Sequence, residues 1–104
     1  MAELRLELYI TGQSPNSEAA VANLRRICEE DLHGRFEVDL QVVDVLENPD
    51  AAEGANIVAT PTLIRRSPLP LRRIVGDLSA RHAVLSGIGI DDDGDDDDEE
   101  PNER

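Results

Sequence analysis

Alternating apolar positions predict the first strand of the chain. Leucine or isoleucine stands at every second position from residue 4 to residue 10, which is the period of a strand with one buried face. After a short break, Ser14 and Pro15 fit the N-cap and the first position of a helix. Apolar residues then recur every three to four positions as far as Leu32, so we expect an amphipathic helix that ends near Gly34.

A second strand is predicted from residue 36, where apolar and polar positions alternate again. At Val42–Val43 the alternation shifts phase, which indicates either burial on both faces of the sheet or a bulge. Residues 48–54 are predicted to form a short helix, in which Asp50 and Glu53 have the spacing of a capping box.

The rest of the folded part is predicted to form two strands and a helix. Pro61 cannot donate a hydrogen bond within a central strand, so the third strand should start there. Residues 67–70 predict a turn and residues 71–75 a fourth strand. A second turn at Gly76–Asp77 leads to a last helix with Ser79 as its N-cap. The apolar side of that helix comprises Val84, Leu85 and Ile88.

The predicted order is β-α-β-α-β-β-α, an α/β chain with a mixed sheet, because a crossover gives a parallel pair and a hairpin an antiparallel one. This order resembles a thioredoxin-like domain, in which a proline at the start of the third strand is usually cis. Thr60-Pro61-Thr62 matches that position, and a cis X–Pro bond costs only ~0.5–1 kcal/mol. Pro61 is therefore a candidate structural cis-proline, with an ordinary trans proline as the alternative.

Charge divides the chain into two unequal parts. Residues 91–104 hold ten acidic residues and one arginine, a net charge of −9, which leaves −4 of the total −13 for residues 1–90. We expect residues 1–90 to form the domain and residues 91–104 a disordered acidic tail. The negative field and the scarcity of aromatic residues argue against a nucleic-acid partner. Without a bilayer-length apolar run or a signal-peptide pattern, we expect no membrane association and a cytoplasmic location.

Ser14 and Ser17 stand at the head of the first helix, where a thioredoxin carries its cysteine pair. Serine cannot form a disulfide, so thiol exchange is not expected there. Cys28 lies on the apolar stripe of the helix, which favours a small buried side chain over a catalytic thiol. His33 and His82 lack companions at metal-ligand spacing. The sequence predicts no enzyme activity and no cofactor, and a redox relic that uses Cys28 is the alternative.

Four arginines flank the predicted prolyl turn. One interpretation is a docking edge for an acidic protein surface, because arginine pairs bidentately with carboxylates. The other is a solvated edge hairpin, which charge and proline protect against strand pairing. The candidate partner interface consists of Arg65, Arg66, Pro68, Pro70, Arg72 and Arg73.

Four segments of the chain, in order, resemble the KaiB family. They are LYITGQSPNS, VDVLENP, ATPTL and PLPLRRIVGDLS, at residues 8–17, 43–49, 59–63 and 68–79. The resemblance extends over residues 4–88. It implies a circadian-clock or timing protein without catalytic activity that binds the N-terminal ATPase ring of a KaiC-type partner. A KaiA-like protein or a histidine kinase is a further partner that it suggests.

The resemblance also implies a change of fold. Members of the KaiB family switch between a ground-state fold, often tetrameric, and a monomeric thioredoxin-like fold that binds KaiC. Gly76 and Asp77 lie where the two folds part, and a glycine free to take a positive φ beside a turn-forming aspartate provides a hinge. We therefore expect a metamorphic chain with a dimeric or tetrameric ground state. The alternative function is a redox-inactive sensor or adaptor module for a histidine kinase or a stress-response partner.

Overall fold

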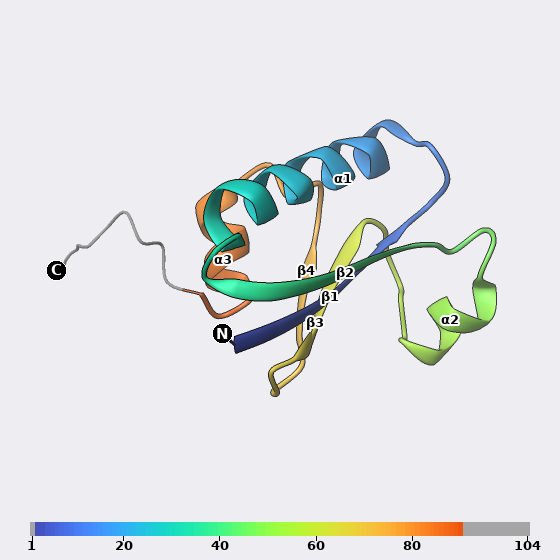
Figure 1. Ribbon diagram of the computed structural model, residues 1–104. Coiled ribbons are helices and arrows are strands. Elements are labelled where there is room, and N and C mark those ends of the chain that lie inside the picture. The colour runs from blue at the N-terminus through green and yellow to red at the C-terminus, as the bar shows by residue number, and fades with distance from the viewer. Residues whose placement is uncertain (1, 91–104) are drawn as a thin grey trace, which may run out of the picture.

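A four-stranded sheet in the order β2-β1-β3-β4 organises the fold (Figure 1). The computed structural model describes residues 2–90, so the predicted tail at 91–104 lies outside the described residues. β2 runs parallel to β1, whereas β3 is antiparallel to both β1 and β4. This confirms the predicted mixed sheet, and the predicted order of strands and helices along the chain is also confirmed. The strands are β1 (Ala2–Ile10), β2 (Phe36–Asp44), β3 (Thr62–Ser67) and β4 (Arg72–Val75).

Helices connect the strands at the predicted places. The described helices are α1 (Pro15–Ile27), its π-helical continuation η1 (Cys28–Leu32), α2 (Pro49–Gly54) and α3 (Arg81–Gly87). None of them has the length and apolar character needed to cross a bilayer. Helices α1 and α3 pack on one face of the sheet, and the segment that ends α2 packs on the other.

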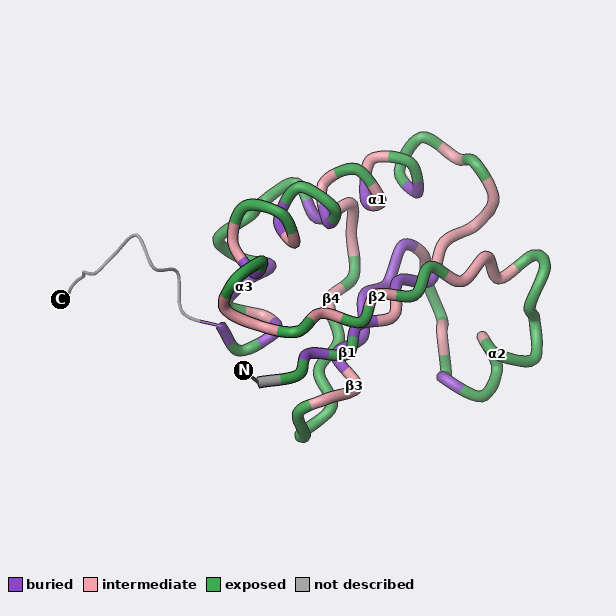
Figure 2. Tube along the Cα trace, viewed as in Figure 1, coloured by how far each residue is buried: buried purple, intermediate pink, exposed green. Residues whose placement is uncertain are grey.

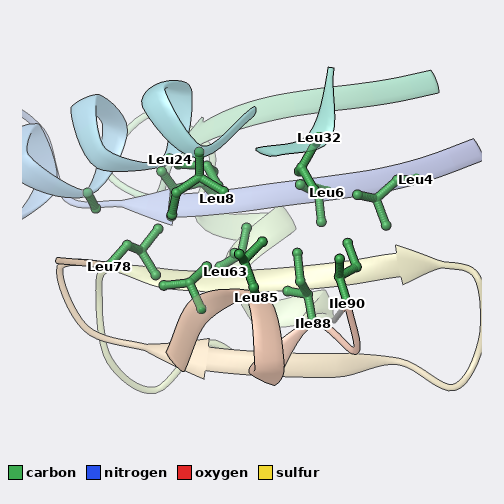
Figure 3. Packing of buried hydrophobic residues seen from close by; sticks show 13 residues of the cluster. Leu4, Leu6, Leu8, Leu24, Leu32, Leu63, Leu78, Leu85, Ile88 and Ile90 are labelled. Atoms are coloured by element: carbon green, nitrogen blue, oxygen red, sulfur yellow. The ribbon is translucent and has the colours of Figure 1, made fainter. Parts of the chain in front are cut away.

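The main core lies between the sheet and the helices α1 and α3. Buried positions gather on β1, on β3 and on the side of α1 that faces the sheet (Figure 2). The alternation of β1 directs Leu4, Leu6 and Leu8 to this face, where they meet Leu24 of α1 and Leu85 of α3 (Figure 3). Burying such side chains contributes about 1.5–3 kcal/mol each, so this face is the main source of stability.

A smaller cluster covers the opposite face of the sheet. Tyr9, Ala55 and Ile64 are buried there, and Val43 packs against them. The pairing of β1 with β2 is continuous, so the bulge, one of the two alternatives at Val42–Val43, is not formed. The phase shift instead marks the place where β2 supplies an apolar side chain to the second face.

The starts of two helices differ from their predicted caps. Asn48 occupies the N-cap of α2 without a side-chain capping bond, so the predicted capping box of Asp50 and Glu53 is not formed. Ala80, one residue after the predicted Ser79, occupies the N-cap of α3. Ser79 belongs instead to the turn before α3, where its backbone N–H donates to Oδ1 of Asp77 at 3.0 Å.

Candidate functional site

Hydroxyl groups occupy the head of α1, where a thioredoxin-like plan would carry thiols. The Ser14 hydroxyl caps α1 by accepting from the backbone N–H of Ser17 at 3.3 Å, and it donates to the Ser17 hydroxyl at 2.9 Å. Ser17 is buried and its Oγ also accepts from the backbone N–H of Thr11 at 3.0 Å. The site is therefore closed by satisfied polar groups and offers no nucleophile poised for thiol exchange.

The strand-start proline lies beside this network. Pro61 is buried and the Thr60–Pro61 peptide bond is cis. The side-chain hydroxyls of Thr11 and Thr60 are hydrogen-bonded to each other, which joins the loop before β3 to the loop before α1. The structure thus brings the head of α1 and Pro61 together, although they are more than forty residues apart.

Cys28 lies far from the head of α1. It is half-buried at the start of η1, and 14 residues of helix separate it from Ser14, a rise of about 21 Å. Burial raises the pKa of its thiol to about 11, with Glu29 adding and Arg25 opposing, so the thiol is protonated at neutral pH. Both histidines are exposed, and among residues 2–90 no group of three acidic, histidine or cysteine side chains could hold a metal ion.

The register of the hairpin divides the four arginines between the two faces of the sheet. Arg65 pairs with Arg72 across β3 and β4, and Arg73 pairs with Ile64. Because side chains alternate along a strand, Arg65 and Arg72 face α3, whereas Arg66 and Arg73 face the cluster around Tyr9. The arginines therefore do not form one continuous surface.

Arg65 is a structural residue in this fold. Its side chain is only 6% exposed, and Nη1 donates to the carbonyl of Ile88 while Nη2 donates to that of Pro70, both at 2.6 Å. Ile88 is the C-cap residue of α3, a position where a cation is favoured by the helix dipole. This corrects the prediction that Arg65 belongs to the exposed edge.

Two more arginines brace the opposite face. Nε of Arg66 donates to Oε1 of Glu7 at 2.8 Å, and the Tyr9 hydroxyl donates to the same oxygen at 3.0 Å. The bond to Glu7 raises the pKa of Arg66 and keeps it charged. Arg73 is exposed, but its Nη2 donates to the carbonyl of Ala55 at 2.6 Å, which ties β4 to the end of α2. Each of these arginines already has an internal partner.

The exposed part of the hairpin is mostly apolar. Pro68 and Pro70 are exposed at its tip, Leu69 between them is 80% exposed, and Arg72 is exposed beside it. Val75 of β4 is 62% exposed too, but it lies on the opposite face of the sheet from Arg72. We call Pro68, Leu69, Pro70 and Arg72 the hairpin surface. The sequence interpretation missed Leu69 and Val75, because exposure of an apolar residue depends on what packs over it.

A strained residue follows the predicted hinge. Gly76 has φ +132°, which glycine adopts freely, whereas Leu78 has φ +62° and is buried in the main core. A left-handed backbone costs a non-glycine residue about 1–2 kcal/mol. The segment is held by a bond from the Gly76 N–H to the Pro61 carbonyl at 3.0 Å and by one from Asn23 to the Asp77 carbonyl at 2.9 Å. Sequence reasoning missed Leu78, which carries no signal for a left-handed conformation.

Together these features define a thioredoxin-like domain without the redox pair, and comparison with solved structures agrees on the fold. The N-terminal domain of Synechococcus elongatus SasA superimposes with a TM-score of 0.68 and 22% identity, over 83% of this chain and 80% of that one. Mitochondrial thioredoxin 3 of Saccharomyces cerevisiae gives 0.66 at 19% identity, over 85% and 78% of the two chains. At these identities the similarity concerns the fold alone.

Sequence comparison defines the family. The KaiB domain model matches residues 7–90. Circadian clock protein KaiB3 of Synechocystis sp. is 49% identical over 90 residues, 86% of each chain. Circadian clock oscillator protein KaiB of Synechococcus elongatus is 48% identical over 85 residues, 82% of this chain and 81% of that protein. The chain belongs to the KaiB family.

Proposed function

We propose that this chain is a timing regulator that acts by binding the ring of a KaiC-type ATPase rather than by catalysis. Its family membership and the circadian names of its relatives support the clock role. The observation that carries the binding role is the exposed apolar tip of the hairpin, where Leu69 is 80% exposed. The hydroxyl network of Ser14 and Ser17 supports the rest of the proposal, because it leaves the head of α1 without a reactive thiol. The thioredoxin-like fold is therefore present without the cysteine pair that carries out thiol exchange at the head of α1.

The hairpin surface is the proposed contact. Exposed apolar side chains beside an arginine are typical of the centre of a protein interface, which is more apolar than its rim and enriched in arginine. Pro68 and Pro70 restrict the backbone, so ordering the tip on a partner costs little conformational entropy. The partner that fits this surface offers an apolar recess flanked by carboxylates, which Arg72 can reach.

The segment from Gly76 to Leu78 is the proposed point of fold switching. The left-handed backbone of Leu78 stores strain that a different path of the chain would release. Two folds of one sequence can interconvert when they differ by only a few kcal/mol. The thioredoxin-like form described here would then be the binding form, and a dimeric or tetrameric form the ground state.

Capture of the ATPase from the same organism tests the proposal. The purified ATPase ring is passed over the immobilised chain in ATP and in ADP, and bound protein is quantified. We expect capture in at least one nucleotide state, and a large loss with Leu69→Asp or Arg72→Glu. Arg25→Glu is the matched control, because Arg25 is exposed on α1 near the opposite edge of the sheet. Failure to capture the ring in either state would contradict the proposal.

Two other functions give different results in the same set of assays. A sensor or adaptor for a histidine kinase, suggested by the fold shared with the SasA domain, would bind a kinase and not the ATPase. A thiol oxidoreductase would reduce insulin and lose that activity with Cys28→Ser. We expect no insulin reduction, because the Cys28 thiol is half-buried and protonated.

A further inference from the structure

Two side-chain tethers join the segment after the hinge to α1 and to its continuation η1. The side-chain amide of Asn23 donates to the carbonyl of Asp77 at 2.9 Å. Arg81, the first residue of α3, forms a bidentate ion pair with Asp31 of η1, in which Nε donates to Oδ2 at 2.8 Å and Nη2 donates to Oδ1. The two residues of each tether are at least 50 positions apart in the sequence.

The π-helical turn η1 places Asp31 for this pair. The buried face of α1 runs through Leu24 and Ile27, so a regular α-helix would next bury position 31. The next buried residue is instead Leu32, five positions after Ile27, which is the spacing of a π-helical turn. Asp31 therefore lies at the margin of the core, where only 9% of its side chain is exposed.

The start of α3 depends on the ion pair more than on the helix itself. A cation in the first turn of a helix opposes the helix dipole, so Arg81 is unfavourable there without a nearby anion. Ala80 makes no side-chain capping bond, and seven residues are too few for a stable isolated helix. The Asp31 carboxylate compensates the charge of Arg81 and ties the first turn of α3 to η1.

Backbone strain lies between the two tethers, because the left-handed Leu78 stands between Asp77 and Arg81. The far end of α3 is held by a buried hydrogen bond from Arg65 to the carbonyl of Ile88. At the start of α3, by contrast, 47% of the Arg81 side chain is exposed, so dissolved ions can screen its ion pair. The start of α3 is therefore the place where detachment of this segment can begin.

We propose that the Asp31–Arg81 ion pair is a salt-sensitive latch, and that its opening lets residues 76–88 leave the sheet as one unit while β1 and α1 stay folded. Cooperative segments of this kind open with a smaller free energy than the whole domain. Opening would relieve the strain at Leu78 and uncover the core side of β3. In linking this release to a change of fold, the inference rests on the proposed function.

Amide hydrogen exchange of the full chain, followed by NMR, tests the latch. The variants are Asp31→Asn and Arg81→Gln, singly and together. The matched control is Arg5→Gln, which breaks an exposed ion pair between β1 and β2. The reporters are the amides of Val84 and Ile88, which donate hydrogen bonds within α3, and they are compared with the amides of α1 and β1.

We expect each single variant to speed exchange at Val84 and Ile88 by about 10-fold, and to change α1 and β1 by less than about 2-fold. The double variant should exchange no faster than either single one, because both remove the same interaction. About 1 M NaCl should speed exchange of α3 in the unmodified chain but not in Asp31→Asn.

Exchange in α3 that is no faster than in Arg5→Gln overturns the proposal. A rise shared equally by α3, α1 and β1 also overturns it, because the pair would then stabilise the whole domain without controlling a local opening. Light scattering of the same samples separates the latch from the proposed fold switch. Faster exchange confined to α3 with unchanged oligomer size would support the latch and count against the switch.

Discussion

Arg65 in β3 donates a hydrogen bond to the carbonyl of Ile88, the C-cap residue of α3, at 2.6 Å and across 23 residues of sequence. The same guanidinium binds the carbonyl of Pro70 at the tip of the hairpin. One side chain therefore joins the third strand, the hairpin and the last helix. These two hydrogen bonds of Arg65 hold the hairpin, and with it the exposed hairpin surface, against the end of α3.

Replacing Arg65 should destabilise the domain. Arg65→Met removes two charge-assisted hydrogen bonds and leaves a buried carbonyl without its donor, a loss of about 2–4 kcal/mol in the free energy of unfolding. Arg25→Met, on exposed α1, should change it by less than about 0.5 kcal/mol. Urea denaturation followed by circular dichroism measures both. Equal stability of the two variants would show that the brace contributes nothing.

The hydroxyl network at the head of α1 should also contribute to stability. Ser17→Ala leaves the Thr11 N–H and the Ser14 hydroxyl without their acceptor, and we expect a loss of about 1–2 kcal/mol. Ser86→Ala is the control, because Ser86 is exposed on α3. Urea midpoints compare the variants at pH 7. A Ser17→Ala protein as stable as Ser86→Ala would argue against a structural role for the network.

Cys28 should be slow to react and should make stability depend on alkaline pH. A thiol pKa of about 11 instead of 9.0 means about 100-fold less thiolate at pH 8, so alkylation by iodoacetamide should be about 100-fold slower than in urea. Because folding raises this pKa, its contribution is complete below pH 9 and is lost as the pH rises from 9 to 11.

Mass spectrometry follows the alkylation, and urea midpoints measured between pH 8 and pH 11 follow the stability. Cys28→Ala should remove part of the alkaline loss and is the control for other titrating groups. Alkylation of the folded chain at the rate of the unfolded one would contradict the protonated, half-buried thiol.

Substitutions at the hinge should change the population of folds. Gly76→Ala forces a side chain onto a residue with φ +132°, and Asp77→Arg removes the carboxylate that accepts from Ser79. Hydrogen bonds from the side chain and then the backbone of Ser79 lower the pKa of Asp77, so both should be lost as the pH falls through this lowered value. Asp77→Asn keeps an acceptor and is the matched control.

Amide NMR spectra and oligomer size report the outcome of the hinge substitutions. We expect Gly76→Ala and Asp77→Arg to alter both, and Asp77→Asn to alter them less. Unchanged spectra and unchanged size in the first two variants would place the hinge elsewhere.

The elements that follow from local patterns were predictable from the sequence. The period of β1, the Ser14–Pro15 start of α1 and the apolar side of α3 all depend on neighbouring residues, and the structure confirms them. Burial of Arg65 was not predictable in this way. It depends on the register between β3 and β4 and on where α3 ends, which are tertiary relationships.

The prediction was less accurate at the turn before α3. Ser79 has the chemistry of an N-cap, yet it lies in the turn, where its backbone N–H donates to Asp77, and Ala80 takes the N-cap position. Leu78 next to it takes a left-handed backbone because its side chain is drawn into the core. A single sequence does not show which residue of this turn will take the N-cap. It also does not show that packing in the core compensates for backbone strain at Leu78.

Size-exclusion chromatography with light scattering, on a mixture of this chain and the KaiC-type ATPase of its organism, tests the binding role most directly. If the chain is a binding regulator, the mixture in ATP or in ADP should elute as one species whose mass is that of the ring plus bound copies of this chain. Leu69→Asp should return it to two separate species. Two separate species of unchanged mass with the unmodified chain, in both nucleotides, would contradict the proposed function.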